Sequence, residues 1–160
     1  MNIALIGSGG REHALCFSLK RSNKVNQIYC MPGNAGTNLI AKNISIDIKD
    51  FKKIKKFVQE NLVDFVIVGP EQPLVDGIVD YLEHYNIKVF GPNKIASQLE
   101  GSKTFTKKLC KKYNIPTANF EIFDNSNDAK KFLETCNLPI VIKADGLAAG
   151  KGVYICKDRH

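Results

Sequence analysis

The sequence predicts an α/β protein: a Rossmann-like parallel sheet followed by the first part of a second α/β domain. Over the first 91 residues, short β-rich runs alternate with longer amphipathic segments, a pattern typical of parallel βα units. After Pro92, two helical segments follow one another with no strand between them. A chain of 160 residues can bury one core and the beginning of another. We therefore expect a domain over residues 1–100 and an incomplete one over residues 101–160.

The first domain is predicted to contain five strands and three helices. The predicted strands are short runs of β-forming residues, and they cover residues 2–7, 27–31, 44–47, 64–69 and 88–91. The helices cover residues 12–20, 51–61 and 73–85, where apolar residues recur at helical spacing. Five strands joined by crossovers predict a Rossmann-like sheet.

The second domain begins with helices predicted over residues 94–99 and 103–113. The second helix ends before Pro116, because proline disfavours a helical conformation at the residue that precedes it. A new unit follows, with a strand over residues 119–123, an N-cap at Ser126 and a helix over residues 127–136. Strands over residues 140–143 and 153–156 then flank a glycine-rich loop.

The cysteines and the apolar runs indicate the cellular compartment in which we expect the protein. The five cysteines contain no C-x-x-C pair that would suggest zinc or a redox dithiol, so we expect buried thiols in a reducing cytosol. The apolar run at Ile3 leaves no room for a signal peptide, and the longest apolar stretches are too short to cross a bilayer. We expect a soluble, cytoplasmic protein with no membrane partner.

The net charge of +7 raises the question of nucleic-acid binding. Much of the lysine, however, sits at helical spacing opposite apolar positions, as in residues 51–58 and 105–113, which is typical of a solvated helix face. No aromatic residue is interleaved with the lysines between residues 107 and 112 for base stacking. We therefore predict no nucleic-acid partner.

A glycine-rich turn, Gly7-Ser8-Gly9-Gly10, joins the first strand to the first helix. Glycines at this place let backbone N–H groups approach a phosphate at the helix N-terminus, although a tight turn without a ligand is also compatible with them. A dinucleotide site would need G-x-G-x-x-G, but Glu12 stands where the third glycine belongs. The second strand also ends without an acidic residue for an adenosine ribose. NAD binding is therefore a distant alternative.

Two further loops follow the second and fourth strands, at residues 32–37 and 68–73. Ligands of open α/β sheets bind at the carboxyl ends of the strands, where all three loops are expected to meet. Glu71 can accept hydrogen bonds from vicinal sugar hydroxyls, or it can simply be a favourable charge at a helix N-terminus. Together the loops describe a small pocket for a phosphorylated sugar.

A fourth loop, residues 142–153, carries a lysine on each side of its glycines, Lys143 and Lys151. It is not a Walker A loop, because only three residues separate Gly146 from Gly150 and because Gly152 stands where Ser or Thr is needed. A strand, loop and strand with flanking lysines can cover a triphosphate, and a surface hairpin without a ligand is the simpler alternative.

These loops resemble, in order and spacing, those of the glycinamide ribonucleotide synthetases, also called phosphoribosylamine-glycine ligases. The resemblance covers essentially the whole chain, and its segments are Gly7-Ser8-Gly9-Gly10-Arg11-Glu12-His13-Ala14, Pro32-Gly33-Asn34-Ala35-Gly36-Thr37, Val68-Gly69-Pro70-Glu71, Gln98-Leu99-Glu100-Gly101-Ser102-Lys103 and residues 143–152. It implies an ATP-grasp ligase of purine biosynthesis. In that reaction ATP phosphorylates the carboxylate of glycine, and the amine of 5-phosphoribosylamine attacks the glycyl phosphate, with Mg²⁺ offsetting charge.

The resemblance also implies roles for particular residues. The residues implied to face phosphoribosylamine are Gly9, Gly10, Asn34 and Glu71. The residues implied to face ATP are Lys103, Lys143, Gly146, Leu147, Gly150, Lys151 and Gly152. His13 is expected to pack at the start of its helix, and no catalytic residue is assigned.

Members of this family continue well beyond the length of this chain. The magnesium ligands, the adenine clamp and most of the glycine site are therefore expected outside it, and the isolated chain is expected to be an inactive fragment. The alternative is a stand-alone module that binds a sugar phosphate or a nucleotide without turnover.

Overall fold

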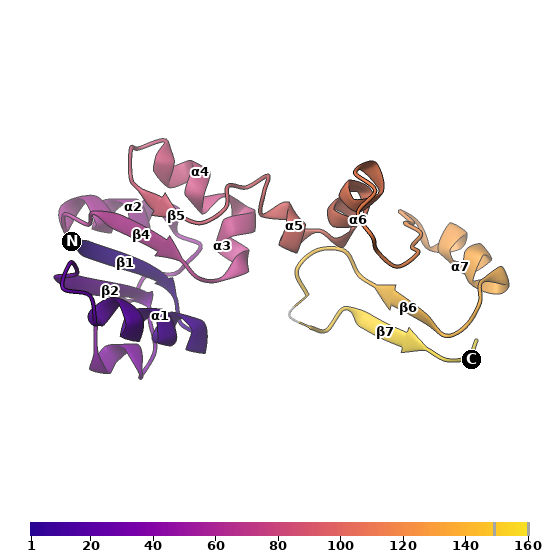
Figure 1. Cartoon of the computed structure of the whole chain (residues 1–160), viewed down its shortest axis with the longest axis horizontal. Helices are drawn as coiled ribbons and strands as arrows, with labels where there is room; N and C mark the ends of the chain where they lie inside the picture. Colours follow the sequence, from indigo (N-terminus) through magenta and orange to yellow (C-terminus); the bar gives the residue numbers. More distant parts are fainter. Residues whose placement is uncertain (149, 160) are drawn as a thin grey trace. The chain divides into compact units, whose positions relative to one another are not determined.

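The computed structural model describes residues 1–148 and 150–159, which form two compact units, Met1–Ser97 and Gln98–His160 (Figure 1). The first unit is built on a five-stranded sheet with the order β3-β2-β1-β4-β5. The second contains a two-stranded sheet, β6-β7, and three helices in its described residues. The α/β fold predicted from the sequence is confirmed.

All strand pairs of the first unit are parallel. The strands are β1 (Asn2–Gly7), β2 (Gln27–Pro32), β3 (Lys42–Asn43), β4 (Phe65–Val68) and β5 (Val89–Phe90). In the register, Gly7 lies beside Pro32 and Ile6 lies beside Val68, so β1, β2 and β4 end at the same edge. The loops that follow these three strands therefore meet at one edge of the sheet.

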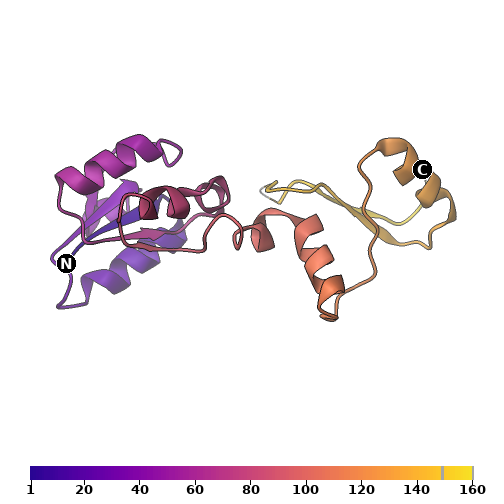
Figure 2. The ribbon, with the colours of Figure 1, turned by 90° about the horizontal axis from the view of Figure 1, so that it is seen from above.

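Helices cover both faces of this sheet (Figures 1 and 2). They are α1 (Gly10–Lys20), α2 (Phe51–Glu60), α3 (Glu71–Asp76) and α4 (Ile78–Glu83), with a short 3₁₀ turn η1 (Thr37–Leu39). Successive residues of β1 point to opposite faces. Leu5 packs with Cys16 of α1, whereas Ile6 packs with Ile54 of α2 and Val79 of α4. This three-layer packing fixes the positions at which the sheet-edge loops begin.

Two elements of the first unit differ from the sequence prediction in more than the exact residues at which they begin and end. The strand predicted over residues 44–47 is instead the two-residue β3, because the N–H of Ile46 turns back to the carbonyl oxygen of Ile44 and leaves the ladder. The single helix predicted over residues 73–85 is two helices, which begin at Glu71 and break at Gly77. Gly77 has φ +94°, a left-handed conformation that ends α3 and that glycine adopts without strain.

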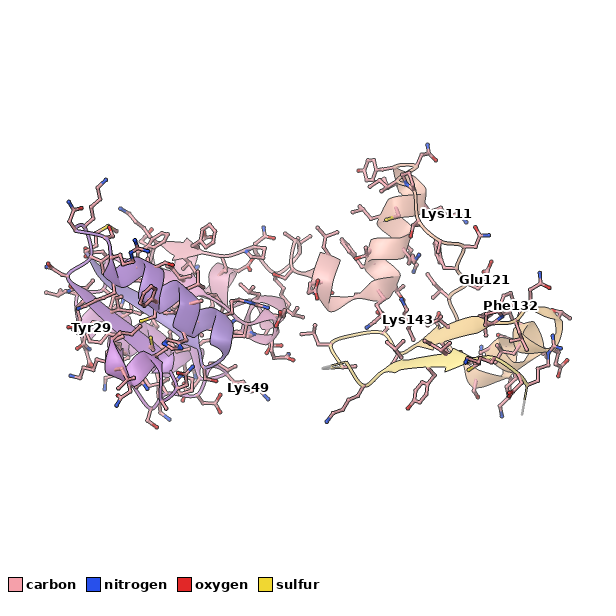
Figure 3. The ribbon with its side chains drawn as sticks, turned by 60° about the horizontal axis from the view of Figure 1, so that its bottom comes forward. Tyr29, Lys49, Lys111, Glu121, Phe132 and Lys143 are labelled. Atoms are coloured by element: carbon pink, nitrogen blue, oxygen red, sulfur yellow. The ribbon has the colours of Figure 1, made fainter. Side chains whose placement is uncertain are left out.

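The second unit has more of its chain in loops. Its elements are α5 (Gln98–Gly101), α6 (Lys103–Lys112), α7 (Ser126–Thr135), β6 (Ile140–Lys143) and β7 (Val153–Cys156). The strands β6 and β7 are antiparallel, and Lys143 lies on β6 while Phe132 lies on α7 (Figure 3). The strands and helices predicted over residues 103–113, 127–136, 140–143 and 153–156 agree with these elements to within one residue.

Three local predictions in this part of the chain are wrong. Residues 94–97 form turns, and the helix begins only at Gln98. The strand predicted over residues 119–123 is a loop, since β6 and β7 pair with each other and, within the described residues, neither pairs with this segment. The N-cap of α7 is Asn125 rather than Ser126, because the side chain of Asn125 accepts a hydrogen bond from the N–H of Asp128.

The cysteines only partly match the prediction of buried thiols. Cys16 and Cys30 are buried, and their sulfur atoms lie 3.9 Å apart, while the other three, Cys110, Cys136 and Cys156, are half-buried. Burial raises the pKa of Cys30 to about 12, and the neighbouring Cys16 adds to this effect. Among the described helices, none combines the length and the apolar character needed to span a bilayer.

Candidate functional site

The three loops at the sheet edge surround β1, the strand on either side of which the sheet is extended. From β1 the chain moves through β2 to β3, and it then returns to the other side of β1 as β4 and β5. In open α/β sheets, such a reversal leaves a crevice between the loops that follow the two neighbouring strands, and ligands bind there. Here those loops follow β1 and β4, with the loop after β2 beside them.

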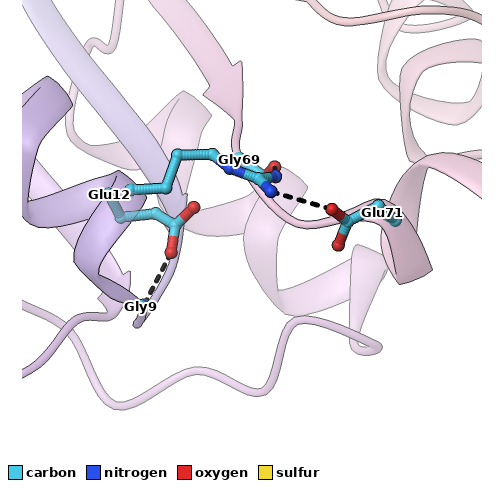
Figure 4. A network of polar contacts seen from close by, with 5 residues as sticks. Gly9, Glu12, Gly69 and Glu71 are labelled. Atoms are coloured by element: carbon cyan, nitrogen blue, oxygen red, sulfur yellow. Dashed lines mark hydrogen bonds and ion pairs between the residues drawn. The ribbon is translucent and has the colours of Figure 1, made fainter. Parts of the chain in front are cut away.

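The loop after β1 presents the N-terminus of α1 to this crevice. Gly9 is the N-cap, and its N–H donates to the Oε2 atom of Glu12 at 2.6 Å (Figure 4). Gly10 is the first residue of the helix, and a Cβ atom added to it would meet no atom within 4 Å. The first turn of a helix has N–H groups without intrahelical acceptors, so this end can hold an anion.

Asn34, in the loop after β2, ties that loop to the loop after β1. Its Nδ2 atom donates to the carbonyl oxygens of Ser8 at 2.8 Å and of Gly9 at 3.1 Å. Its Oδ1 atom accepts from the N–H of Thr37 at 2.9 Å, and the buried Thr37 hydroxyl lies 2.8 Å from Oδ1 of Asn43. The side chain of Asn34 therefore positions the two loops relative to each other.

Glu71 begins α3, just beyond β4, and pairs with Arg11 of α1. One guanidinium nitrogen of Arg11 donates to the carbonyl oxygen of Gly69 at 2.6 Å, and the other donates to Oε1 of Glu71 at 2.9 Å (Figure 4). The hydrogen bond from Arg11 lowers the pKa of Glu71, so the carboxylate stays ionised at neutral pH. Its side chain is 43% exposed, which leaves carboxylate surface open to a ligand.

His13 lies one turn further along α1, and its exposed imidazole covers Gly36 in the loop after β2. A Cβ atom at Gly36 would lie 2.5 Å from Cε1 of His13. Gly36 is therefore needed so that the ring can approach the loop. The contact is one of packing, and it adds a further link between α1 and the loop after β2.

In the second unit, the glycine-rich loop after β6 is fastened to the start of α6. Asp145 accepts from the hydroxyl of Ser102 at 3.0 Å and from the N–H of Thr104 at 3.2 Å. The Nζ atom of Lys103 donates to the carbonyl oxygen of Gly146 at 2.8 Å. The structure thus brings together Lys103 and Gly146, two of the residues expected to face ATP.

Asp145 was not among the residues singled out from the sequence, although it is the centre of this arrangement. Burial raises its pKa, but the hydrogen bonds from Thr104, Ser102 and Gly146 outweigh that effect and lower the pKa to about 2. The signal available in the sequence was an aspartate beside Gly146, together with a helix N-terminus at Ser102 whose N–H groups need acceptors. Their contact, 43 residues apart, required the structure.

The remaining residues of this loop are open to solvent. Lys143, Gly150 and Lys151 are exposed, and Leu147 is 37% exposed. A hydrogen bond of 2.8 Å from the N–H of Ala144 to the carbonyl oxygen of Gly152 closes the base of the loop. Ala149 lies outside the described residues. Among the described residues, no group of three or more His, Cys, Asp or Glu side chains is arranged to hold a metal ion.

Comparison with known proteins shows two family models along the chain. Residues 1–100 match the model "Phosphoribosylglycinamide synthetase, N domain", and residues 101–160 match "Phosphoribosylglycinamide synthetase, ATP-grasp (A) domain". The two matches together cover every residue of the chain.

Individual relatives agree with these models. The phosphoribosylamine–glycine ligases of Clostridium acetobutylicum and Caldanaerobacter subterraneus are each 49% identical over 158 residues. The crystal structure of the Thermotoga maritima phosphoribosylamine–glycine ligase superposes with a TM-score of 0.77 at 31% identity, over 99% of this chain and 36% of that one. The present chain spans 38% of the length of the first two relatives. The chain belongs to the phosphoribosylglycinamide synthetase family, as the matches to the models of its N domain and its ATP-grasp domain show.

Proposed function

We propose that this chain supplies the phosphoribosylamine site and the first part of the ATP site of a phosphoribosylamine–glycine ligase. The reaction joins glycine to 5-phosphoribosylamine at the expense of ATP and gives glycinamide ribonucleotide, ADP and phosphate. The main support for the proposal is the pair of hydrogen bonds from Asn34 to the carbonyl oxygens of Ser8 and Gly9. These bonds hold two loops together around the N-terminus of α1. This arrangement is suited to a phosphate group.

The sugar phosphate would lie over the start of α1. The N–H of Gly9 already donates to Glu12, so the phosphate would be met by the N–H groups of the turn that follows, from Gly10 onward. The open space at Gly10 leaves room for it. The ionised carboxylate of Glu71, at the other side of the crevice, would accept hydrogen bonds from the ribose hydroxyls.

ATP would be held by the second unit. Lys103, Lys143 and Lys151 provide positive charge for the phosphates, and the loop of Gly146, Leu147, Gly150 and Gly152 would close over them. When bound, Mg²⁺ would offset the charge of the transferring phosphoryl group. The adjacent free thiols of Cys16 and Cys30 fit a reducing compartment, and we propose the cytoplasm.

The sugar-phosphate site can be tested on the 160-residue chain by calorimetric titration with ribose 5-phosphate and, separately, with MgATP. Gly10→Ala adds a methyl group that has room in the protein but would occupy the place of the phosphate. We expect ribose 5-phosphate to bind at least tenfold more weakly and MgATP to bind unchanged. Ser18→Ala, on the exposed side of the same helix, is the control. Equal binding by Gly10→Ala and the unaltered chain would place the phosphate elsewhere.

The complete reaction can be tested with a chimera that joins this chain to the segment that follows the matched region in the Clostridium acetobutylicum relative. Formation of glycinamide ribonucleotide would support the proposed ligase. In the chimera, Glu71→Ala should raise KM for phosphoribosylamine with little change for ATP, and Lys143→Ala should do the reverse. Binding of ribose 5-phosphate without turnover in a folded chimera would favour a binding module.

A further inference from the structure

We propose that Glu12 is a positioning residue that holds the phosphate-binding loop of the first unit in its working conformation. The inference rests on the sugar-phosphate site proposed above. No direct contact with a ligand is proposed for Glu12. Its carboxylate instead fixes the backbone that the ligand would contact, and it lies against Gly69 in the turn after β4.

Glu12 is a buried carboxylate, only 4% exposed, in the first turn of α1. Its Oε2 atom accepts a hydrogen bond from the N–H of Gly9 at 2.6 Å (Figure 4). The bond satisfies the N–H of the N-cap residue and fixes the direction of the peptide that enters the helix. The N–H groups that follow are then left to face an anion.

The carbonyl group of Gly9 is held in place as well. The carbonyl oxygen of Gly9 accepts from the N–H of His13 at 3.1 Å and from Nδ2 of Asn34 at 3.1 Å. The N–H of Gly9 is therefore fixed by Glu12 and its carbonyl oxygen by α1 and the loop after β2. Removing Glu12 would leave only one side of this residue anchored.

Glycines at the ends of two strands make the room that Glu12 occupies. A Cβ atom at Gly7, the last residue of β1, would lie 2.7 Å from Cδ of Glu12. A Cβ atom at Gly69, just after β4, would overlap Oε1 of the same carboxylate. Gly7 has φ +126°, which already favours glycine, but Gly69 has no positive φ, so the carboxylate is the visible reason for its missing side chain.

The carboxylate of Glu12 thus lies against the ends of β1 and β4 and fills the space that a side chain at residue 69 would take. In a dinucleotide-binding loop this helix position carries a glycine so that helix and strand can pack closely. Here the roles are exchanged, because the helix contributes the side chain and the strand ends contribute the glycines. The geometry predicts that substitutions of Glu12 and Gly69 have coupled effects on ligand binding.

A double-mutant cycle in the 160-residue chain tests this coupling. Glu12→Ala removes the carboxylate, and Gly69→Ala expels it without straining the backbone. We expect each single variant to bind ribose 5-phosphate at least tenfold more weakly. We expect the double variant to bind no more than twofold more weakly than Glu12→Ala alone, because the added methyl group fills the vacated space. MgATP binding should be unchanged in all three.

Two further measurements separate positioning from a general loss of structure. The NMR signal of the Gly9 amide proton should be shifted and should exchange faster with solvent in Glu12→Ala and Gly69→Ala, while circular dichroism stays that of a folded chain. Glu12→Gln, which retains an acceptor oxygen, should recover most of the affinity even if Glu12→Ala unfolds. Glu83→Ala, an exposed helix position, is the matched control.

The outcomes for Glu12 and for the sugar-phosphate site are distinguishable. If the unaltered chain fails to bind ribose 5-phosphate, both proposals fall. If it binds, and folded Glu12→Ala binds equally well with an altered Gly9 amide signal, the inference about Glu12 is overturned while the site stands. Fully additive effects of the two single substitutions would also overturn the coupling of Glu12 to Gly69.

Discussion

The glycine-rich loops of the two units are held in place in different ways. In the first unit, side chains lie directly against the loop glycines: Glu12 against Gly69, His13 against Gly36, and Asn43 against Gly33. In the second unit, a Cβ atom added to Gly146 or Gly150 would meet no atom within 4 Å, and one added to Gly152 would meet only Ala148 and Ala144 of the same loop. The first set of loops is packed, whereas the second is fastened mainly through Asp145 and Lys103.

The same contrast extends to the cores behind the loops. The first unit buries residues from three of its strands and from its helices, among them Leu5, Ile6 and Ile54, which are fully buried. Among the described residues of the second unit, only Gly101 is buried, and Ile155 on β7 is 70% exposed. The proposed sugar-phosphate site is therefore preformed on a packed scaffold, while the loop proposed for ATP depends on a few polar contacts.

The largest effect should come from replacing an isoleucine by alanine in a strand of each unit. Ile6→Ala removes a fully buried side chain and should lower the free energy of unfolding of the first unit by about 2 to 5 kcal/mol. Ile155→Ala in the exposed strand should lower that of the second unit by less than about 1 kcal/mol. Urea unfolding followed through the NMR signals of Tyr29 and Tyr154 reports on each unit. Similar losses from both substitutions would remove the distinction.

An intermediate effect is expected at two glycines that share a left-handed backbone. Gly33 has φ +76° and faces Asn43 and Thr37, so Gly33→Ala should destabilise the first unit by more than about 2 kcal/mol. Gly146 has φ +86° and open space around it, so Gly146→Ala should destabilise the second unit by only about 1 kcal/mol, the cost of the backbone conformation alone. The same urea experiment measures both. Equal losses would mean that packing adds nothing at Gly33.

The smallest effect should be an acid-dependent loosening of the second unit. The pKa of Asp145 is about 2 in the folded chain, below the value of about 3.9 for a free aspartate. Its hydrogen bonds to Ser102 and Thr104 therefore contribute stability that is complete above about pH 4 and is lost as the pH falls toward 2. The amide signal of Thr104 should titrate with a midpoint near 2 and should lose this transition in Asp145→Asn. A midpoint near 4 would contradict the interaction.

Local patterns in the sequence predicted most of the architecture, because alternation and helical spacing depend on near neighbours. The apolar run from Ile3 to Ile6 predicts a strand without knowledge of its partners. Patterns mislead where a single backbone conformation decides, as at Gly77, whose positive φ divides one predicted helix into two. They also mislead where a strand forms only if it has a hydrogen-bonding partner, as at residues 119–123, which are a loop.

The proposed sites were predictable only in part for a related reason. That the loops after β1, β2 and β4 share one edge follows from a parallel sheet. The sequence marked Glu12 only as a departure from a dinucleotide motif, since its burial depends on Gly69, which lies far along the chain. The bonds that Asn34 and Asp145 make are likewise formed between distant segments. Which residues touch a ligand stays a prediction.

The buried pair Cys16 and Cys30 has a consequence for chemical labelling. Alkylating reagents react with the thiolate, and a pKa of about 12 leaves very little thiolate at Cys30, where solvent access is also blocked. The half-buried thiols, Cys110, Cys136 and Cys156, all lie in the second unit. In the native chain a maleimide should therefore mark the second unit first. Later labelling at Cys16 and Cys30 would then record the opening of the first unit.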